Sequence, residues 1–140
     1  MTEIIKKDTD YAMRMLAYLA LNNGESPVAA RKLAAAGEVP EDFAYKILRK
    51  LTRAGLTVGT MGSHGGFKLG KAPQAISLLD VVSAIQGNLT VRECCLSRDA
   101  CSRKGTCDIC KILGGLQNDL TGSLQKLTLA DVLKETINKN

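Results

Sequence analysis

The chain has 140 residues and a formal net charge of +5, and 45% of its residues are hydrophobic. This length fits one compact domain with appended helices, and the hydrophobic share suffices for a core. No hydrophobic run approaches the ~20 residues that span a bilayer, and the first residues lack the ordered regions of a signal peptide. We therefore expect a cytoplasmic protein with no membrane partner.

The positive charge is concentrated in one segment. Residues 31–71 hold eight Lys or Arg residues against three Asp or Glu, an excess as large as the +5 of the whole chain. No acidic residue occurs between Phe43 and Lys71. Local charge of one sign favours a polyanionic partner, although a solvated helix face would have the same composition.

Three helices are predicted before residue 55. Hydrophobic residues at three- and four-residue spacing predict an amphipathic helix over residues 8–22. A short helix follows from about Val28 to Ala36, with a tight turn at residues 37–39. Pro40 suits the first turn of a third helix, which runs to Ala54 and ends at Gly55. The predicted hydrophobic face of this third helix consists of Phe43, Ile47, Leu48 and Leu51.

The second and third helices, joined by a three-residue turn, form a helix-turn-helix pattern whose second helix is basic. This signal is weak alone, but a hairpin follows directly. Two β-type runs, residues 56–58 and 67–69, flank a loop that contains Gly59, Gly62, Gly65 and Gly66. Such a hairpin is a wing, and its glycines let backbone N–H groups approach phosphates.

The C-terminal half is predicted to hold three more helices. A capping box at residues 77–80 opens a helix that runs to about Gln86. An irregular loop follows over residues 87–106, and a longer helix then runs from about Cys107 or Asp108 to about Leu124. Its hydrophobic face comprises Ile109, Leu113, Leu116, Leu120 and Leu124. Three glycines in this helix indicate close packing of another helix, either in a dimer or within the monomer. Residues 128–131 cap a last short helix.

Five cysteines fall between Cys94 and Cys110, and the rest of the chain has none. Their order is Cys94-Cys95-x5-Cys101-x5-Cys107-x2-Cys110. In a cytoplasmic protein such a cluster indicates a metal or redox site rather than structural disulfides. Structural zinc prefers two close C-x2-C pairs, and only one is present. The even six-residue spacing favours an iron–sulfur cluster, with zinc and a thiol switch as alternatives.

Five motifs along the whole chain point to one known family. They are Tyr11-Ala12-Met13-Arg14, Leu48-x2-Leu51-x2-Ala54-Gly55-Leu56, the wing Gly62-x2-Gly65-Gly66-Phe67-x-Leu69, the C-x5-C-x5-C run, and the tail from Leu120-Thr121-Gly122 to Leu133. With them the chain resembles the IscR/NsrR-type winged-helix regulators. That group includes the regulator of iron–sulfur biogenesis, nitric-oxide sensors, an iron-responsive regulator and a cysteine-metabolism repressor.

We expect a mainly α fold with a small β-hairpin wing, a winged helix-turn-helix followed by a long C-terminal dimerisation helix. The DNA-binding domain would span residues 1–75, and residues 76–140 would hold the cluster-binding loop and the dimerisation helices. The resemblance implies a homodimer on a pseudo-palindromic site in double-stranded DNA, with the third helix in the major groove and the wing in the minor groove.

The resemblance also implies that Cys95, Cys101 and Cys107 hold a [4Fe-4S] or [2Fe-2S] cluster. The fourth ligand has two candidates. Cys110 occupies the place of a His in the biogenesis regulator, and Asp10 matches an Asp that the partner subunit contributes in the nitric-oxide sensors. Cys94 matches no position of the pattern and could replace Cys95 in a shifted register.

The candidate DNA contacts lie on the helix-turn-helix and the wing. Tyr45 matches the place where the biogenesis regulator reads a base edge through Glu, so base preference should differ. In the wing, Met61 stands where Arg is usual, and Ser63-His64 where Pro-Gly is common. The candidates are Arg31, Tyr45, Lys46, Arg49, Lys50, Arg53, Ser63, His64, Gly65, Gly66 and Lys68.

The sequence therefore predicts a DNA-binding transcriptional regulator, a repressor. An iron–sulfur cluster that senses redox state, nitric oxide or iron supply would control its affinity for the operator. The alternative is a metal-free regulator of the same fold that acts through thiol oxidation or a partner protein. We expect no enzyme, because the chain has one His, no paired acid–base groups and no nucleotide-binding loop.

Overall fold

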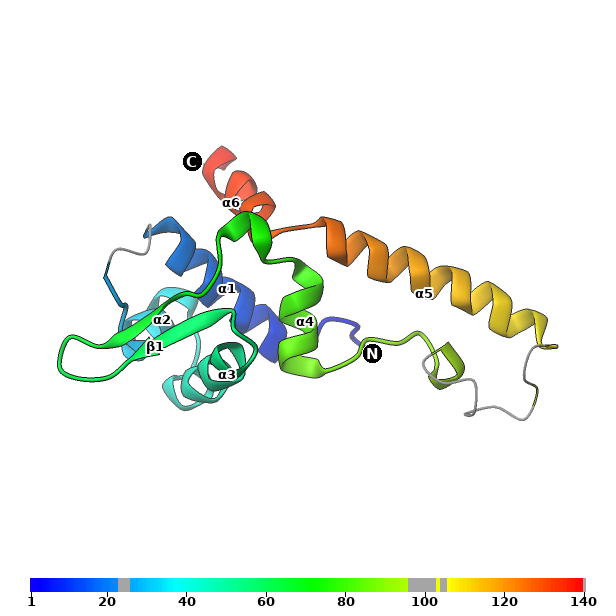
Figure 1. Cartoon of the computed structure of the whole chain (residues 1–140), viewed down its shortest axis with the longest axis horizontal. Helices are drawn as coiled ribbons and strands as arrows, with labels where there is room; N and C mark the ends of the chain where they lie inside the picture. The colour runs from blue at the N-terminus through cyan, green and yellow to red at the C-terminus, as the bar shows by residue number, and fades with distance from the viewer. Residues whose placement is uncertain (23–25, 96–102, 104–105, 140) are drawn as a thin grey trace.

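The described residues are mostly helical. The computed structural model describes residues 1–22, 26–95, 103 and 106–139. Its elements are α1 (Lys7–Leu21), α2 (Ala30–Gly37), α3 (Glu41–Arg53), β1 (Thr57–Thr60), β2 (Gly66–Leu69), η1 (Pro73–Ala75), α4 (Leu78–Gln86), η2 (Glu93–Cys95), α5 (Asp108–Lys126) and α6 (Leu129–Asn138). The predicted fold, mainly α with a two-stranded hairpin, is confirmed (Figure 1).

Helix α1 lies at the centre of the body. It contacts α2, α3, α4 and α6 (Figure 1). Its hydrophobic residues at i, i+3 and i+4, including Met15 and Leu16, are fully buried, as the spacing predicts. Each large apolar side chain buried in this way contributes about 1.5–3 kcal/mol, so α1 organises a core that the surrounding helices share.

The wing is an antiparallel hairpin joined to the helix-turn-helix. Strands β1 and β2 pair with Thr57 opposite Leu69 and Thr60 opposite Gly66. Phe67 also exchanges two backbone hydrogen bonds with Val28, at 2.9 and 2.8 Å. Because these bonds use the N–H and C=O of Val28, α2 begins at Ala30 rather than at Val28. The wing is therefore fixed to the residues that precede α2.

Two details of the helix-turn-helix differ from expectation. The left-handed residue of the turn is Glu38, with φ 54°, whereas Gly37 is the last residue of α2. A Cβ at Gly37 would lie 3.4 Å from Cβ of Arg14, so this glycine permits close packing against α1. Phe43 is exposed and does not join the hydrophobic face of α3, where Ala44 is buried instead.

Residues 87–95, 103 and 106–126, the described part of the segment after α4, form an arm that leaves the body and returns to it. At its root, Leu78 N–H donates to Leu127 O at 2.8 Å, and Leu129 N–H donates to Ile76 O at 2.9 Å. Both predicted capping boxes, Ser77 with Asp80 and Thr128 with Asp131, begin helices at this root. Helix α5 extends away from the body, whereas α6 packs back on α1 (Figure 1).

None of the helices in the described ranges combines the length and hydrophobicity that crossing a bilayer would require.

Candidate DNA interface and cysteine site

The outer face of α3 is basic. Its inner face packs on the core through Ala44, Ile47, Leu48 and Leu51, so the helical period places the cations outside. These exposed cations are Lys46, Arg49, Lys50 and Arg53. They line a shallow groove of about 390 Å³ together with Phe43, Ile47 and Asp8. Such a face can bind phosphates.

The four cations of α3 are not equivalent. Lys50 Nζ donates to the carbonyl oxygen of Ile85 at 3.4 Å, in the last turn of α4. Lys46 Nζ lies 5.8 Å from the centre of the Phe43 ring. No ion pair of these cations occurs within the described part of the chain. Lys46 and its neighbours are therefore available to an anionic partner, while Lys50 also joins α3 to α4.

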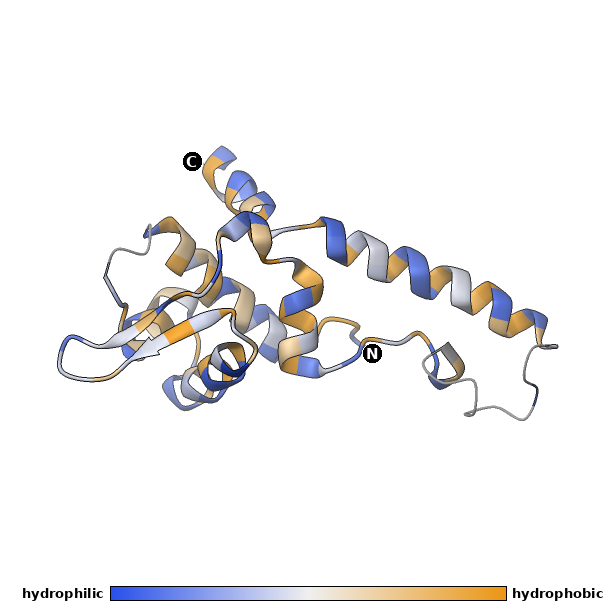
Figure 2. Cartoon of the chain, viewed as in Figure 1, coloured by the Kyte–Doolittle hydropathy of each residue, from blue (hydrophilic) through white to orange (hydrophobic). Residues whose placement is uncertain are grey.

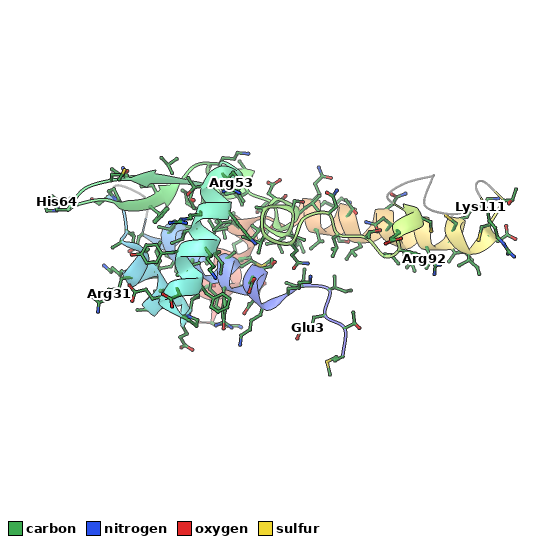
Figure 3. All side chains as sticks on the ribbon, turned by 90° about the horizontal axis from the view of Figure 1, so that it is seen from below. Glu3, Arg31, Arg53, His64, Arg92 and Lys111 are labelled. Carbon is green, nitrogen blue, oxygen red and sulfur yellow. The ribbon has the colours of Figure 1, made fainter. Side chains whose placement is uncertain are left out.

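The remaining predicted DNA contacts lie at the same end of the molecule. Figure 3 shows Arg31 on α2, Arg53 on α3 and His64 at the tip of the wing, far from Arg92 and Lys111 on the arm. Tyr45 and Ser63 are exposed, and Lys68, Gly65 and Gly66 are partly buried in the wing. The structure thus brings the candidates from α2, α3 and the wing together on one end.

The wing tip presents an apolar side chain. Met61 is 97% exposed, beside His64. Gly62 has φ +107°, and a Cβ at Gly65 would collide with the carbonyl oxygen of Thr60. The glycines are therefore required by the shape of this turn.

The described cysteines lie at the end of the arm away from the body. The Sγ atoms of Cys94 and Cys110 are 3.5 Å apart, and Cys107 is the N-cap residue of α5. Cys101 lies outside the described residues, and only the backbone of Cys95, in η2, is described. Among the described residues, no three Cys, His, Asp or Glu side chains form a metal-binding group.

The donor set nevertheless suits a soft metal centre. Two thiols are in contact, and a third, Cys107, lies one helical turn before Cys110. Thiolates are the ligands of iron–sulfur clusters. The residues present therefore fit such a group.

Asp10, the other candidate for the fourth ligand, lies in the first turn of α1. Its carboxylate forms a 2.8 Å ion pair with Arg14. Nη1 of the same arginine donates to the carbonyl oxygen of Gly37 at 3.2 Å, just before the turn of the helix-turn-helix. Within the described part of the chain Asp10 is therefore linked, through Arg14, to the start of the helix-turn-helix turn.

Sequence reasoning missed two glutamines that organise the site. Gln86, the last residue of α4, accepts from Lys6 N–H at 2.8 Å and from the hydroxyl of buried Thr9 at 2.7 Å. Gln117 on α5 accepts from Val91 N–H at 2.6 Å and donates to Leu89 O at 2.8 Å. Gln86 lies at the predicted end of its helix and Gln117 in the middle of the predicted long helix, and no sequence pattern indicates the hydrogen bonds of either.

Comparisons with known proteins agree with this arrangement. The profile of the Rrf2 family, described as "Iron-dependent Transcriptional regulator", matches residues 5–135. The chain is 35% identical to protein aau3 of Rhizobium meliloti, over 93% of this chain and 84% of that protein. It is 31% identical to the HTH-type transcriptional regulator NsrR of Halalkalibacterium halodurans, over 89% of this chain and 86% of that protein.

The fold is also found in solved structures. CymR (YrzC), the global cysteine regulator of B. subtilis, superimposes with a TM-score of 0.77 at 21% identity, covering 96% of this chain and 98% of that chain. IscR of T. potens superimposes with a TM-score of 0.73 at 22% identity, covering 94% and 87%. The match to the family profile over nearly the whole chain establishes that this protein belongs to the Rrf2 family of transcriptional regulators.

Proposed function

We propose that this regulator is a homodimeric repressor whose affinity for operator DNA is set by an iron–sulfur cluster on its cysteines. The observation that carries the proposal is the position of the cysteine segment. It follows α4, whose last turn contacts both α3, through Lys50 and Ile85, and the start of α1, through Gln86 and Thr9. A change at the cysteines can therefore reach α3, the helix proposed to enter the major groove, through α4.

The DNA-binding part of the proposal rests on charge and shape. The α3 cations would contact phosphates and base edges in the major groove, and the wing would enter the minor groove. Tyr45 is 46% exposed on α3, so its hydroxyl can reach a base edge. Phosphate contacts fix the register of the protein, and base contacts give the sequence preference.

The dimer is supported by α5. Ile109, Ile112 and Leu116 are 66%, 68% and 53% exposed, and their spacing of three and four residues places them on one face of α5. Hydrophobic residues recur along the whole of this helix (Figure 2). A Cβ at Gly114, Gly115 or Gly122 would meet nothing within 4 Å in the described monomer. Packing within the monomer therefore does not explain these glycines. A second copy of α5 would cover the face, as the reading of two half-sites requires.

For the cluster, the ligands would be Cys95, Cys101 and Cys107, with Cys110 or Asp10 of the partner subunit as the fourth. When bound, the cluster supplies a centre that reacts with oxidants or nitric oxide and is lost when iron is scarce. Ligation would hold the cysteine segment against the first turn of α5. Release would free α4 to shift against Lys50 of α3 and Thr9 of α1, and a coupling of ~1–3 kcal/mol suffices for a switch.

The test begins with protein purified without oxygen, in which iron and sulfide per chain are measured beside absorption and Mössbauer spectra. We expect about four irons for [4Fe-4S] or about two for [2Fe-2S]. Operator duplex is selected from a random library with the loaded protein, and affinity is then compared for loaded and iron-free samples. Cys95→Ala and Cys107→Ala should bind no iron, and their DNA affinity should no longer depend on iron loading. The matched control Cys94→Ala should keep both the iron and this dependence.

Two further variants distinguish the candidates for the fourth ligand. Cys110→Ser should change the spectrum of the bound cluster if Cys110 is the ligand, and Asp10→Asn should change it if Asp10 is. The cluster proposal fails if wild-type protein made without oxygen holds no iron, or if Cys95→Ala releases DNA as wild type does.

The alternative, a metal-free regulator, is favoured by the contact between two thiols and by the fold shared with a cysteine regulator. Colourless, iron-free protein that still binds the selected duplex, and loses it on thiol oxidation or addition of a partner protein, would establish that alternative.

A further inference from the structure

Cys94, which has no place among the cluster ligands, forms a pair with Cys110, one of the two candidates for the fourth ligand. They are 16 residues apart in the chain, yet their sulfur atoms lie 3.5 Å apart. Both side chains are partly buried, so a small reagent can still reach them. Cys94 has no place in the C-x5-C-x5-C pattern, and its contact with Cys110 gives it a role of its own.

The residues before Cys94 and the helix that holds Cys110 are fixed by contacts with α5 and within it. Cys94 lies in η2, which packs on α5, and Cys110 lies in the first turn of α5. Gln117 fixes the residues before η2, because its side chain bonds to both Val91 N–H and Leu89 O. The two thiols therefore meet because ordered elements bring them together.

We propose that Cys94 and Cys110 form an intramolecular disulfide when the protein holds no cluster. A disulfide bond measures about 2.05 Å, so the two sulfur atoms need to approach by roughly 1.5 Å, which side-chain rotation in a partly exposed pair can supply. The inference stands on the sulfur contact alone and does not require the iron–sulfur proposal.

The oxidant is a low-molecular-weight disulfide such as glutathione disulfide. One thiolate attacks it, forming a mixed disulfide and releasing one thiol. The second thiolate of the pair then attacks the protein sulfur of that mixed disulfide and releases the other thiol. In balance, two protein thiols become one disulfide, and one small disulfide becomes two thiols. Because the pair is already in contact, the second step should be fast and the mixed disulfide should not accumulate.

The disulfide would have a direct consequence for ligation. It removes Cys110 from the donor set, so it excludes a cluster whose fourth ligand is Cys110. It also ties η2 to the first turn of α5. A cluster that uses Asp10 of the partner subunit is compatible with it. The state of this pair and the choice of the fourth ligand are therefore linked.

The experiment uses the full chain, freed of iron by a chelator, checked by metal analysis and reduced with dithiothreitol. After incubation with glutathione disulfide, remaining thiols are alkylated and the protein is digested with trypsin. Cleavage after Arg92, Arg98, Lys104 and Lys111 gives the peptides 93–98 and 105–111. We expect these two peptides to be linked, with a mass lower by two hydrogens than their sum, and dithiothreitol to separate them.

Each linked peptide contains two cysteines, so single variants identify the pair. Cys94→Ser and Cys110→Ser should lose the linked peptide and accumulate glutathione adducts, whereas Cys95→Ser and Cys107→Ser should retain it. Circular dichroism confirms that each variant is folded. Fragmentation of the linked wild-type peptide assigns the same pair without any substitution. The inference is overturned if wild type yields only glutathione adducts, or if the link persists without Cys94 or without Cys110.

Discussion

The body and the arm of this protein bury their hydrophobic residues to very different degrees. In the body, α1 and α3 present every hydrophobic residue of their inner faces to a shared core, and Met15, Leu48 and Leu51 have no exposed surface. In the arm, only Leu124 of α5 is buried, and the exposed apolar residues lie far from the core (Figure 2). The body therefore covers its own hydrophobic residues, whereas nothing in the described monomer covers Ile109, Ile112 and Leu116 of α5.

This difference separates two functions along the chain. The body carries the basic face of α3 and the wing, and the backbone bonds between Val28 and Phe67 hold the wing beside α2. The arm carries the described cysteines and the uncovered face of α5, and it meets the body at the root and where α5 packs on α4. Under the proposed function, a signal received on the arm would reach the body through these contacts.

The largest effect is expected from a charge placed on the exposed hydrophobic face of α5, because that face is the one that the body does not cover. We expect Leu116→Asp to convert the dimer to monomers, because an unpaired carboxylate buried in an apolar interface costs about 3 kcal/mol, or roughly a 100-fold weaker association. Operator affinity should fall with it. Light scattering after gel filtration measures the mass.

The matched control is Asn118→Asp, which adds the same charge to an exposed position on the opposite side of α5. It should stay dimeric. Circular dichroism of Leu116→Asp should show an unchanged helical body. A dimer of unchanged mass in Leu116→Asp would mean that this face is not the interface.

Within the body, the wing glycines test how tightly that part is packed. A Cβ at Gly66 would collide with the backbone of Val28, whereas a Cβ at Gly59 would meet only the Phe67 ring at 3.5 Å. We expect Gly66→Ala to destabilise the protein by about 1–3 kcal/mol and to weaken DNA binding. Gly59→Ala, in the same hairpin, should be nearly neutral. Thermal unfolding measures the stability of both variants, and duplex binding measures their DNA affinity. Equal effects of the two substitutions would contradict the close packing of Gly66 against Val28.

Two lysines of α3, Lys46 and Lys50, test whether a change on the arm reaches the DNA-binding face of the body through α4. Lys46→Ala should weaken binding to all duplexes alike and reduce the slope of log affinity against log salt by about one, as loss of one phosphate contact does. Lys50→Ala also removes the bond to Ile85 O. Lys50→Ala should therefore reduce, by several-fold, the difference in DNA affinity between cluster-loaded and iron-free protein. Lys46→Ala should leave that difference unchanged. Identical behaviour of the two variants would exclude this route for the signal.

Much of the body was predictable because local signals and packing agree there. The periodicity of α1, the glycine after α3 and the two capping boxes each fix an element whose ends the structure confirms closely. Phe43 was misplaced because its position lies at the edge of the hydrophobic face of α3, and the core there is filled by Ala44. The start of α2 was misplaced because Val28 bonds to Phe67, a contact 39 residues away that no local pattern reveals.

The candidate site was predictable only in its residue types. Spacing marked the cysteines, but the meeting of Cys94 and Cys110 depends on how η2 folds against α5. The charges of α3 predicted a basic face, yet the use of Lys50 as a tie to α4 follows from the placement of α4 alone. Gln86 and Gln117 gave no signal, because an amide shows its hydrogen-bond partners only in the folded chain.

The smallest expected effect concerns the root, where arm and body meet. The backbone N–H and hydroxyl of Thr128 donate to the Asp131 carboxylate at 2.9 and 3.1 Å. These bonds, the backbone one first, lower the pKa of Asp131 below its ordinary value of 3.8. A carboxylate whose pKa is lower in the folded state stabilises that state at pH above the unfolded value, and this contribution disappears as pH falls through the folded one.

Asp131→Asn should therefore lower the melting temperature slightly at pH 7, and the difference from wild type should shrink as pH falls below 3.8. Glu135→Gln, which removes the same charge from the second half of α6, outside the capping box, serves as control and should leave the melting temperature at pH 7 nearly unchanged. A difference that stays constant into acid would mean that the capping box at the root does not depend on the charge of Asp131. The junction would then rest on its backbone pairing between residues 76–78 and 127–129.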